Sequence, residues 1–387
     1  MHTIIHITYS TISDSNSYGL QIDSCKKKGM NVIILDISAI YNFPKPTFPK
    51  QNASLVKHLT SFSELDDFIK NLSIMNTLIN VQIGYEWRFR KLFRLIARYP
   101  KHHFSLFLFG QLPFQNQRKL EKIIGKIISS PFGSLKKIVI KILEKILFKI
   151  HIYSLPKYIF YAGETTKPST FHFEAYPINY CDYDYFLENQ ESSIGDYIVF
   201  LDDGIFQHPD DAIVGNKITP ELITRYQKSM NLFFDYLEKK LNLEVIISGH
   251  PKVQYAPGFF GNRKIIRNES PKLIQKCKFA ICHYSSSLSL AVCYKKPILF
   301  TYNQAIEEFS KENQPIKEYI LNLSMALNQP IINIDDSDSI NSVTSLEIDS
   351  LKYANFVLNY LTTRETQNTK SEDVFSGYLK RIFKSKD

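Results

Sequence analysis

Three short polar motifs, each directly after a short apolar run, limit what this chain can fold into more than any other feature of its sequence. The apolar runs are rich in β-branched and aromatic residues, which is typical of buried strands. Because the carboxyl ends of parallel strands meet at one edge of a sheet, polar residues that follow such strands converge on the crevice where open α/β sheets bind ligands. The three are the aspartate motif (Asp202-Asp203-Gly204, after 197–201), the His-Pro motif (His250-Pro251, after 243–248) and the serine motif (Ser285-Ser286-Ser287, after 278–282).

Short apolar runs alternate with helical patterns along most of the chain, so the sequence predicts an α/β fold with parallel sheets. The strands predicted before the aspartate motif cover 3–8, 30–36, 78–83, 104–109 and 158–161. The helices predicted there cover 20–29 (ending at Gly29, after a polar loop at 10–17), 62–72 (capped by Ser61 or Ser63) and 87–98. The later strands cover 197–201, 244–248, 278–282 and 297–301, and the later helices about 219–241, 270–276, 286–293 and 356–361.

The chain has 387 residues, which is long enough for two domains with separate hydrophobic cores. We predict an N-terminal α/β domain over residues 1–190 and a C-terminal α/β domain over 195–365. The passage between them is expected at 177–195. Residues 366–387 form a tail that is basic towards its end and is expected either to cross back to the first domain or to fray.

The formal net charge is +9, and much of it comes from the segment 118–149. This segment combines regularly spaced Lys and Arg with Ile, Leu and Val at helical period, which is typical of amphipathic helices that lie on an anionic membrane surface. The alternative is an ordinary domain helix whose aliphatic face belongs to the core. Nucleic acid is not expected as a partner, because no recognisable nucleic-acid-binding motif accompanies the charge.

The five cysteines include no CxxC pair, which favours a reducing compartment without disulfides or a zinc site. We find no signal peptide pattern and no apolar stretch long enough to cross a membrane. The expected location is therefore the cytoplasm, either in solution or peripherally on the inner face of the cytoplasmic membrane.

The aspartate motif supplies two neighbouring carboxylates, Asp202 and Asp203. Neighbouring side chains on a strand point to opposite faces, so only one of the two is expected to face a bound hydroxyl group. A carboxylate in a cleft is a simple general base for an attacking alcohol. Metal binding is a competing interpretation, although no recognisable acidic metal loop is present. A turn in which the aspartates cap backbone N–H groups is the structural alternative.

The other two motifs suit a phosphate group. His250 is expected at a strand end because Pro251 takes the chain out of the sheet, and its imidazole can hydrogen-bond or protonate a phosphate oxygen. Lys252 adds positive charge. Serine hydroxyls at the start of a helix, together with its backbone N–H groups, form an anion site, so Ser285, Ser286 and Ser287 are candidate phosphate contacts. The structural alternatives are a buried structural histidine and plain helix capping by serine.

Taken in chain order, the three motifs resemble those of bacterial sialyltransferases and related nonulosonate transferases. The resemblance covers about 197–300 and implies a GT-B architecture, in which two Rossmann-like domains face a cleft. It implies that Asp202 is the base, with the choice between Asp202 and Asp203 left open, and that His250, Ser286 and Ser287 bind the phosphate of a CMP leaving group. The implied reaction is inverting transfer of a sialic, pseudaminic or legionaminic type acid from a CMP-sugar to a hydroxyl of a bacterial surface glycan, without a metal or cofactor.

The His-Pro motif, together with Tyr284-Ser285-Ser286 and the later run from Lys295 to Phe300 (KKPILF), also resembles polyol-phosphate polymerases that use CDP-glycerol. Kdo transferases of capsule synthesis are a third similar group. All three assemble surface glycans or related polymers from cytidine nucleotides, and the expected acceptor is a glycan or a lipid-linked oligosaccharide. A non-catalytic glycan-binding or assembly protein is the alternative of a different class.

Overall fold

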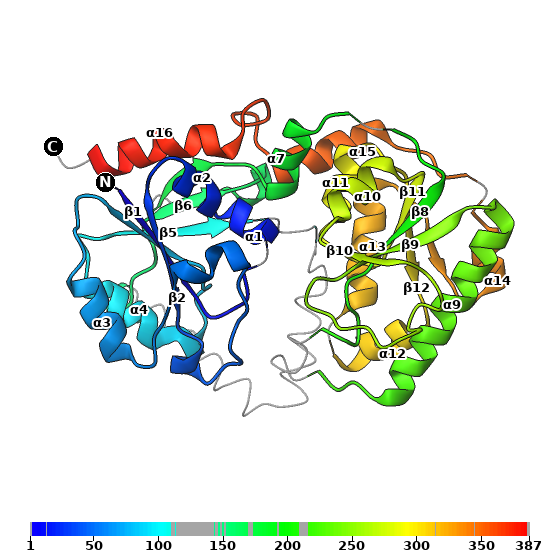
Figure 1. Cartoon of the computed structure of the whole chain (residues 1–387), viewed down its shortest axis with the longest axis horizontal. Coiled ribbons are helices and arrows are strands. Elements are labelled where there is room, and N and C mark those ends of the chain that lie inside the picture. Colours follow the sequence, from blue (N-terminus) through cyan, green and yellow to red (C-terminus); the bar gives the residue numbers. More distant parts are fainter. Residues whose placement is uncertain are drawn as a thin grey trace.

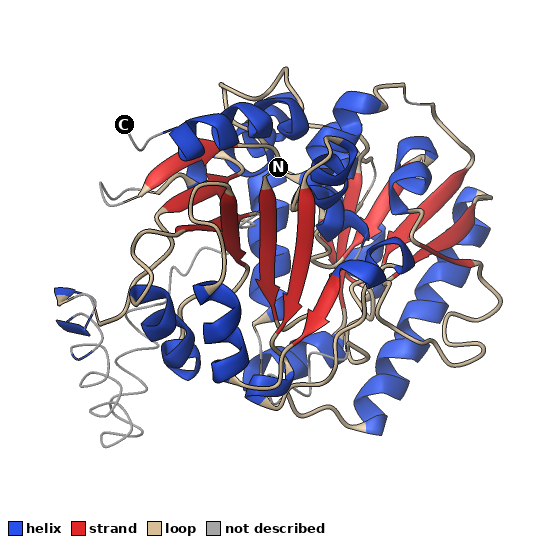
Figure 2. Ribbon diagram, turned by 60° about the vertical axis from the view of Figure 1, so that its left-hand side comes forward, coloured by secondary structure: helices blue, strands red, loops and turns tan. Residues whose placement is uncertain are grey.

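The computed structural model describes residues 2–12, 14–109, 113, 143, 146–147, 149–150, 152–168, 173–191, 193–208, 216–313, 315–343 and 345–384. Each half of the chain is built around its own parallel sheet, and the two halves lie side by side (Figure 1). The strand order is β3-β2-β1-β4-β5-β6-β7 in the first sheet and β10-β9-β8-β11-β12-β13 in the second. Helices pack along both sheets (Figure 2). The predicted α/β fold with two Rossmann-like halves is therefore confirmed.

The first sheet forms where the sequence places its apolar runs, and its central strands β1 and β4 are almost completely buried. Two short strands, β3 and β7, were not predicted; each is largely half-buried or exposed and lacks the apolar run of a central strand. The strands are β1 Thr3–Thr8, β2 Asn31–Asp36, β3 Val56–His58, β4 Thr77–Val81, β5 His103–Leu108, β6 Tyr158–Tyr161 and β7 Glu174–Pro177.

The helix predicted over 20–29 is wrong in its bounds. The structure has α1 (Asp14–Gly19) and α2 (Ile22–Lys27), and α1 begins inside the expected polar loop. Gln21 separates the two because its φ of 61° is left-handed, which interrupts a right-handed helix. The remaining helices of this half are α3 (Phe62–Lys70, capped by Ser61), α4 (Arg90–Ala97) and the short 3₁₀ turns Ala39–Tyr41, Lys50–Leu55, Trp87–Phe89 and Glu164–Thr166.

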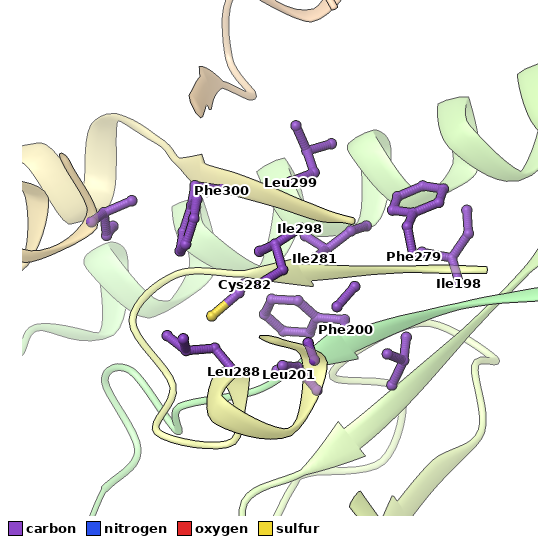
Figure 3. Close-up of a cluster of buried hydrophobic side chains, with 14 of the residues drawn as sticks. Ile198, Phe200, Leu201, Phe279, Ile281, Cys282, Leu288, Ile298, Leu299 and Phe300 are labelled. Atoms are coloured by element: carbon purple, nitrogen blue, oxygen red, sulfur yellow. The ribbon is translucent and has the colours of Figure 1, made fainter. Parts of the chain in front are cut away.

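The four strands predicted for the second sheet are present to within a residue at each end, and the two outer strands, β10 and β13, were not predicted. Its strands pack into one large buried cluster with the helices around them (Figure 3). The strands are β8 Tyr197–Leu201, β9 Glu244–Gly249, β10 Ile265–Arg267, β11 Phe279–Cys282, β12 Ile298–Tyr302 and β13 Ile331–Asn333. The helices are α9 Pro220–Leu241, α10 Ser270–Lys276, α11 Leu288–Cys293, α12 Gln304–Glu312, α13 Ile316–Leu327, α14 Ser337–Asn341 and α15 Ser350–Phe356.

The chain passes between the halves twice. The expected passage at 177–195 contains an unpredicted helix, α7 (Cys181–Glu188). The late helix predicted at 356–361 is a π-helical turn, Val357–Leu361, which continues α15. The tail then forms α16 (Ser371–Lys384), which returns to the first half, where Phe375, Leu379 and Ile382 join that half's core (Figure 1).

The basic segment 118–149 lies outside the described residues except for Leu143, Ile146, Leu147 and Lys149. Within the described part of the chain, no helix is both long and apolar enough to span a bilayer. The five cysteines are buried free thiols.

Candidate functional site

The three polar motifs meet where the strand order of the second sheet reverses. Strand β8 pairs with β9 on one side and β11 on the other, and Leu201 is in register with both Ser248 and Cys282. The three strands therefore end at nearly the same level, and each delivers its motif to the same edge. This reversal is the point at which open α/β sheets form a ligand crevice.

The two aspartates of the first motif point to different neighbours, as their positions beyond a strand predict. The Tyr255 hydroxyl donates to Asp202 Oδ2 and accepts a bond from the backbone N–H of His250 at 2.6 Å. Asp203 Oδ2 instead accepts from the backbone N–H of Tyr284 at 3.0 Å. Asp202 is thus tied to the His-Pro motif and Asp203 to the segment that leads into the serine motif.

Burial raises the pKa of both carboxyl groups. The pKa of Asp202, which is 5% exposed, rises to about 6, although hydrogen bonds from Tyr255 and from the backbone N–H groups of Gly204 and His250 oppose the shift. The pKa of Asp203 lies well above its ordinary value, because of burial and then the nearby charge of Asp202. A carboxyl with a pKa near neutrality is suited to proton transfer at physiological pH.

Gly204 lets the first two motifs approach each other. Its φ of +67° is left-handed, and a Cβ atom there would lie 2.6 Å from Val253 Cγ2 and 3.6 Å from His250 Cβ. Only glycine combines this backbone conformation with this packing.

His250 directly follows β9, as predicted, and its ring is oriented by its own loop. The backbone N–H of Lys252 donates to Nδ1 at 3.3 Å, which leaves the proton of the neutral imidazole on Nε2. The ring of His208 packs against it with centroids 4.7 Å apart. The imidazole can therefore donate through Nε2 to a ligand oxygen.

The serine motif begins a helix of six residues, α11, without the side-chain cap that was considered as an alternative. The backbone N–H groups of residues 288–290 donate to the carbonyls of 285–287, so they are already satisfied within the chain. The hydroxyl of Ser285 interacts with Asp203, and that of Ser286 with Tyr180. The predicted anion site therefore depends on the serine hydroxyls.

A cavity of about 300 Å³ lies between the two halves and reaches two of the motifs. A second cavity of about 230 Å³ lies beyond the carboxyl ends of β1, β4 and β5, and the two cavities share Tyr180 and Cys181. Neither cavity is lined by the other predicted site residues, which are Asp202, Asp203, His250, Lys252 and Ser285. The larger cavity is lined by Tyr18, Tyr180, Cys181, Asp182, Tyr185, Pro251, Asn268, Ser270, Pro271, Ser286, Ser287 and Leu290.

Two residues at this site were missed by the sequence analysis. Tyr255 lies in a loop whose conformation the sequence does not reveal. Asp182 lies in the first turn of α7, and its neighbours give no strand-end signal of the kind that marked Asp202. Among the described residues, no group of three or more His, Cys, Asp or Glu side chains could hold a metal ion.

Two Rossmann-like domains whose strand ends border a shared cleft define the GT-B fold, and this is the fold of the chain. Among solved structures, the chain is similar to a histidine-to-asparagine variant of the wall teichoic acid polymerase TagF, with a TM-score of 0.53 and 12% identity over 99% of this chain and 89% of that one. A histidine-to-alanine variant of TagF is similar with a TM-score of 0.52 and 12% identity, over 99% of this chain and 89% of that one. The UDP-GlcNAc 2-epimerase of Methanocaldococcus jannaschii gives a TM-score of 0.49 and 13% identity, over 98% of this chain and all of that one. No protein-family model and no curated protein sequence matches the chain.

Proposed function

We propose that the protein is an inverting glycosyltransferase that moves a nonulosonic acid from a CMP donor to a hydroxyl group of a bacterial surface glycan. The observation that carries the proposal is the convergence of the aspartate, His-Pro and serine motifs at one sheet edge, beside a cavity between the two domains. The GT-B fold, shared with the wall teichoic acid polymerase TagF, supports a nucleotide-activated donor. The donor is a substrate, and the scheme uses no metal or resident cofactor.

The positions of the three motifs support the following roles. Asp202 or Asp203 takes the proton of the acceptor hydroxyl, and burial raises the pKa of both; the pKa of Asp202, about 6, leaves that carboxyl mainly charged and able to accept a proton near neutral pH. His250 donates from Nε2 to the departing phosphate, and Ser286 and Ser287 contact it from the cavity wall. Ser285 and Lys252 hold the neighbouring loops and supply further polar groups. Fixed donors at a departing phosphate stabilise the charge that develops there.

Donor screening combined with three substitutions tests this function. CMP, CDP, UDP and GDP are compared by thermal shift, because a ligand that binds the native state raises its stability. Transfer from a CMP-activated nonulosonic acid is then measured with Asp202→Asn, Asp203→Asn and His250→Ala. Loss of a general acid or base is expected to lower kcat by about 10² to 10⁴. Glu221→Gln, an exposed carboxyl at the start of α9, is the matched control.

Unchanged transfer in the aspartate variants and in His250→Ala would overturn the catalytic assignment. Nucleotide binding without transfer to any glycan acceptor would favour a non-catalytic glycan assembly protein.

A CDP-polyol phosphotransferase is the second candidate, and the similarity to TagF favours it, since one TagF structure of this fold was soaked with CDPG. Such an enzyme would use the same motifs on a CDP-activated polyol, and a Kdo transferase would use a CMP donor with a different sugar. Parallel assays with CMP-sialic acid, CMP-Kdo and CDP-glycerol separate the three, because only the true donor supports turnover.

We also propose that the protein rests peripherally on the inner face of the cytoplasmic membrane, near a lipid-linked acceptor. An exposed apolar group supports this: Ile146, Ile150 and Ile152 are 49%, 55% and 39% exposed. The backbone N–H of Ser154 donates to the Phe93 carbonyl, which places this segment beside α4. The same helix α4 carries exposed basic side chains, Lys91 and Arg94.

A further inference from the structure

The cavity of about 300 Å³ has an unusual lining for a phosphate site. Among the described residues, its lining contains one carboxyl group, Asp182, and no Lys, Arg or His side chain. Ser286 and Ser287, the proposed phosphate contacts, line the same cavity. A phosphate beside them would share a small, partly desolvated space with Asp182, and two negative charges at such a distance repel strongly.

Asp182 is held so that both of its protonation states have partners. Its Oδ2 lies within hydrogen-bond distance of the Ser289 hydroxyl on α11. Ser289 also lies 2.7 Å from the Ser286 carbonyl. A charged Asp182 accepts the proton of Ser289 at Oδ2, and a neutral Asp182 protonated on Oδ1 keeps this bond. The carboxyl group can therefore change its charge without losing its partner on α11.

The other oxygen of Asp182 is loosely held. Among the described residues, Oδ1 is contacted only by the thiol of Cys181, at 3.6 Å. A thiol is a weak donor, so a proton on Oδ1 would displace little. Within the described part of the chain, Asp182 has no salt bridge, so no neighbouring cation stabilises its negative charge.

Burial raises the pKa of Asp182 to about 6, against the opposing hydrogen bonds of Ser289 and Cys181. The titratable groups around Asp182 are thiols and phenols whose own pKa values burial raises, so they are neutral near pH 7. His250 precedes Pro251 in the chain but is not itself part of the lining. The thiols and phenols are Cys181 and Tyr185 on α7, Cys293 and Tyr294 on α11, Tyr180 before α7 and Tyr18 on α1.

We propose that Asp182 is a phosphate-recognition residue that takes up a proton when a nucleotide phosphate enters the cavity and then donates its O–H to a phosphate oxygen. This inference rests on the proposed function, since it assumes that the cavity binds the phosphate of the donor. Proton uptake removes the repulsion and converts the single carboxylate of the lining into a hydrogen-bond donor. The site thereby binds a phosphate although the described part of its wall has no lysine or arginine.

CMP binding measured by calorimetry between pH 5.5 and 8.5 tests the inference, with each pH studied in two buffers of different ionisation enthalpy. Near pH 7, free Asp182 is mainly charged and bound Asp182 is neutral, so the wild type takes up close to one proton. Above pH 6 its affinity for CMP is expected to fall about tenfold for each pH unit. Asp182→Asn carries no titrating group but keeps an N–H donor, so it is expected to bind CMP at least about tenfold more tightly than the wild type at pH 8.

The CMP phosphate itself titrates near pH 6, and because it does so equally with both proteins, only the difference between them is read. Cytidine, which lacks the phosphate, should bind without Asp182-dependent proton uptake, and Glu221→Gln should behave like the wild type. Equal proton uptake and equal pH dependence in the wild type and Asp182→Asn would overturn the inference while leaving nucleotide binding intact. If CMP, UDP, GDP and inorganic phosphate all fail to bind the wild type, the proposed function fails as well.

Discussion

At the scale of single residues, the Tyr255 hydroxyl joins two motifs that are far apart in the sequence. It donates to the Asp202 carboxylate and accepts from the backbone N–H of His250. The guanidinium of Arg267 lies over the Tyr255 ring, 5.2 Å from its centre, in a cation–π contact. The spacing between the proposed base and the proposed phosphate histidine therefore depends on one phenol.

Tyr255→Phe is expected to alter both stability and the pH dependence of transfer. It keeps the ring but removes a partner from a buried carboxylate, which costs about 1 to 3 kcal/mol in the free energy of unfolding measured in urea. The Tyr255 bond lowers the pKa of Asp202, so its loss raises that pKa above about 6. A base acts in its charged form, so the acid limb of the kcat/KM profile should move to higher pH.

Tyr236→Phe is the control, because the Tyr236 hydroxyl bonds only at the surface, to Asn341 at 3.1 Å and to Lys240. A profile that does not move in Tyr255→Phe would show that Asp202 is not the titrating base and would leave Asp203 in that role.

Sequence reasoning found the residues at strand ends and missed their partners. Asp202, His250 and Ser286 were located because each follows an apolar run whose end is visible in the sequence. Tyr255 and Asp182 were not, because their positions depend on the path of a loop and on the packing of α7 against α11. Contacts of this kind arise only when segments distant in the sequence are brought together by folding.

At the scale of elements, the loop after β8 depends on Gly204. Gly204→Ala is expected to destabilise the protein by more than the roughly 1 to 2 kcal/mol that a left-handed alanine costs, because the new Cβ would also meet Val253 at 2.6 Å. Urea unfolding measures the loss. Gly258→Ala is the matched control: its φ is +74° but no atom lies within 4 Å of the new Cβ. Equal losses in the two variants would mean that contact with Val253 contributes nothing.

Elements were predicted well where one feature dominates the local sequence. The long helix α9 begins with Thr219 as cap and a proline in its first turn, and its start was placed correctly. The short strands β3, β10 and β13 have three residues each and are partly exposed, so no apolar run marks them. Helix α7 has aromatic and acidic residues without a clear apolar stripe, and packing against both halves determines its structure.

At the scale of the whole molecule, the exposed apolar group on the first half is the feature that would place the protein at a membrane surface. Replacing Ile150 and Ile152 together by serine removes two side chains that could enter a bilayer, so binding to vesicles containing anionic lipid should weaken by at least about tenfold in co-sedimentation. Leu351→Ser is the control, because Leu351 is 71% exposed on α15 in the other half. Binding that survives the double substitution and is insensitive to salt would exclude this face as the contact.

The return of α16 to the first half also affects how the protein is made. The hydroxyl of Ser371, the first residue of α16, accepts from the backbone N–H of Asn179, which lies 192 positions earlier in the chain. At the usual rate of synthesis, about 10 to 40 seconds separate the two residues as they leave the ribosome. During that interval the first sheet is present, but the groove that will receive Phe375, Leu379 and Ile382 is uncovered. The second half can fold meanwhile, so the first domain to be synthesised is the last to be completed.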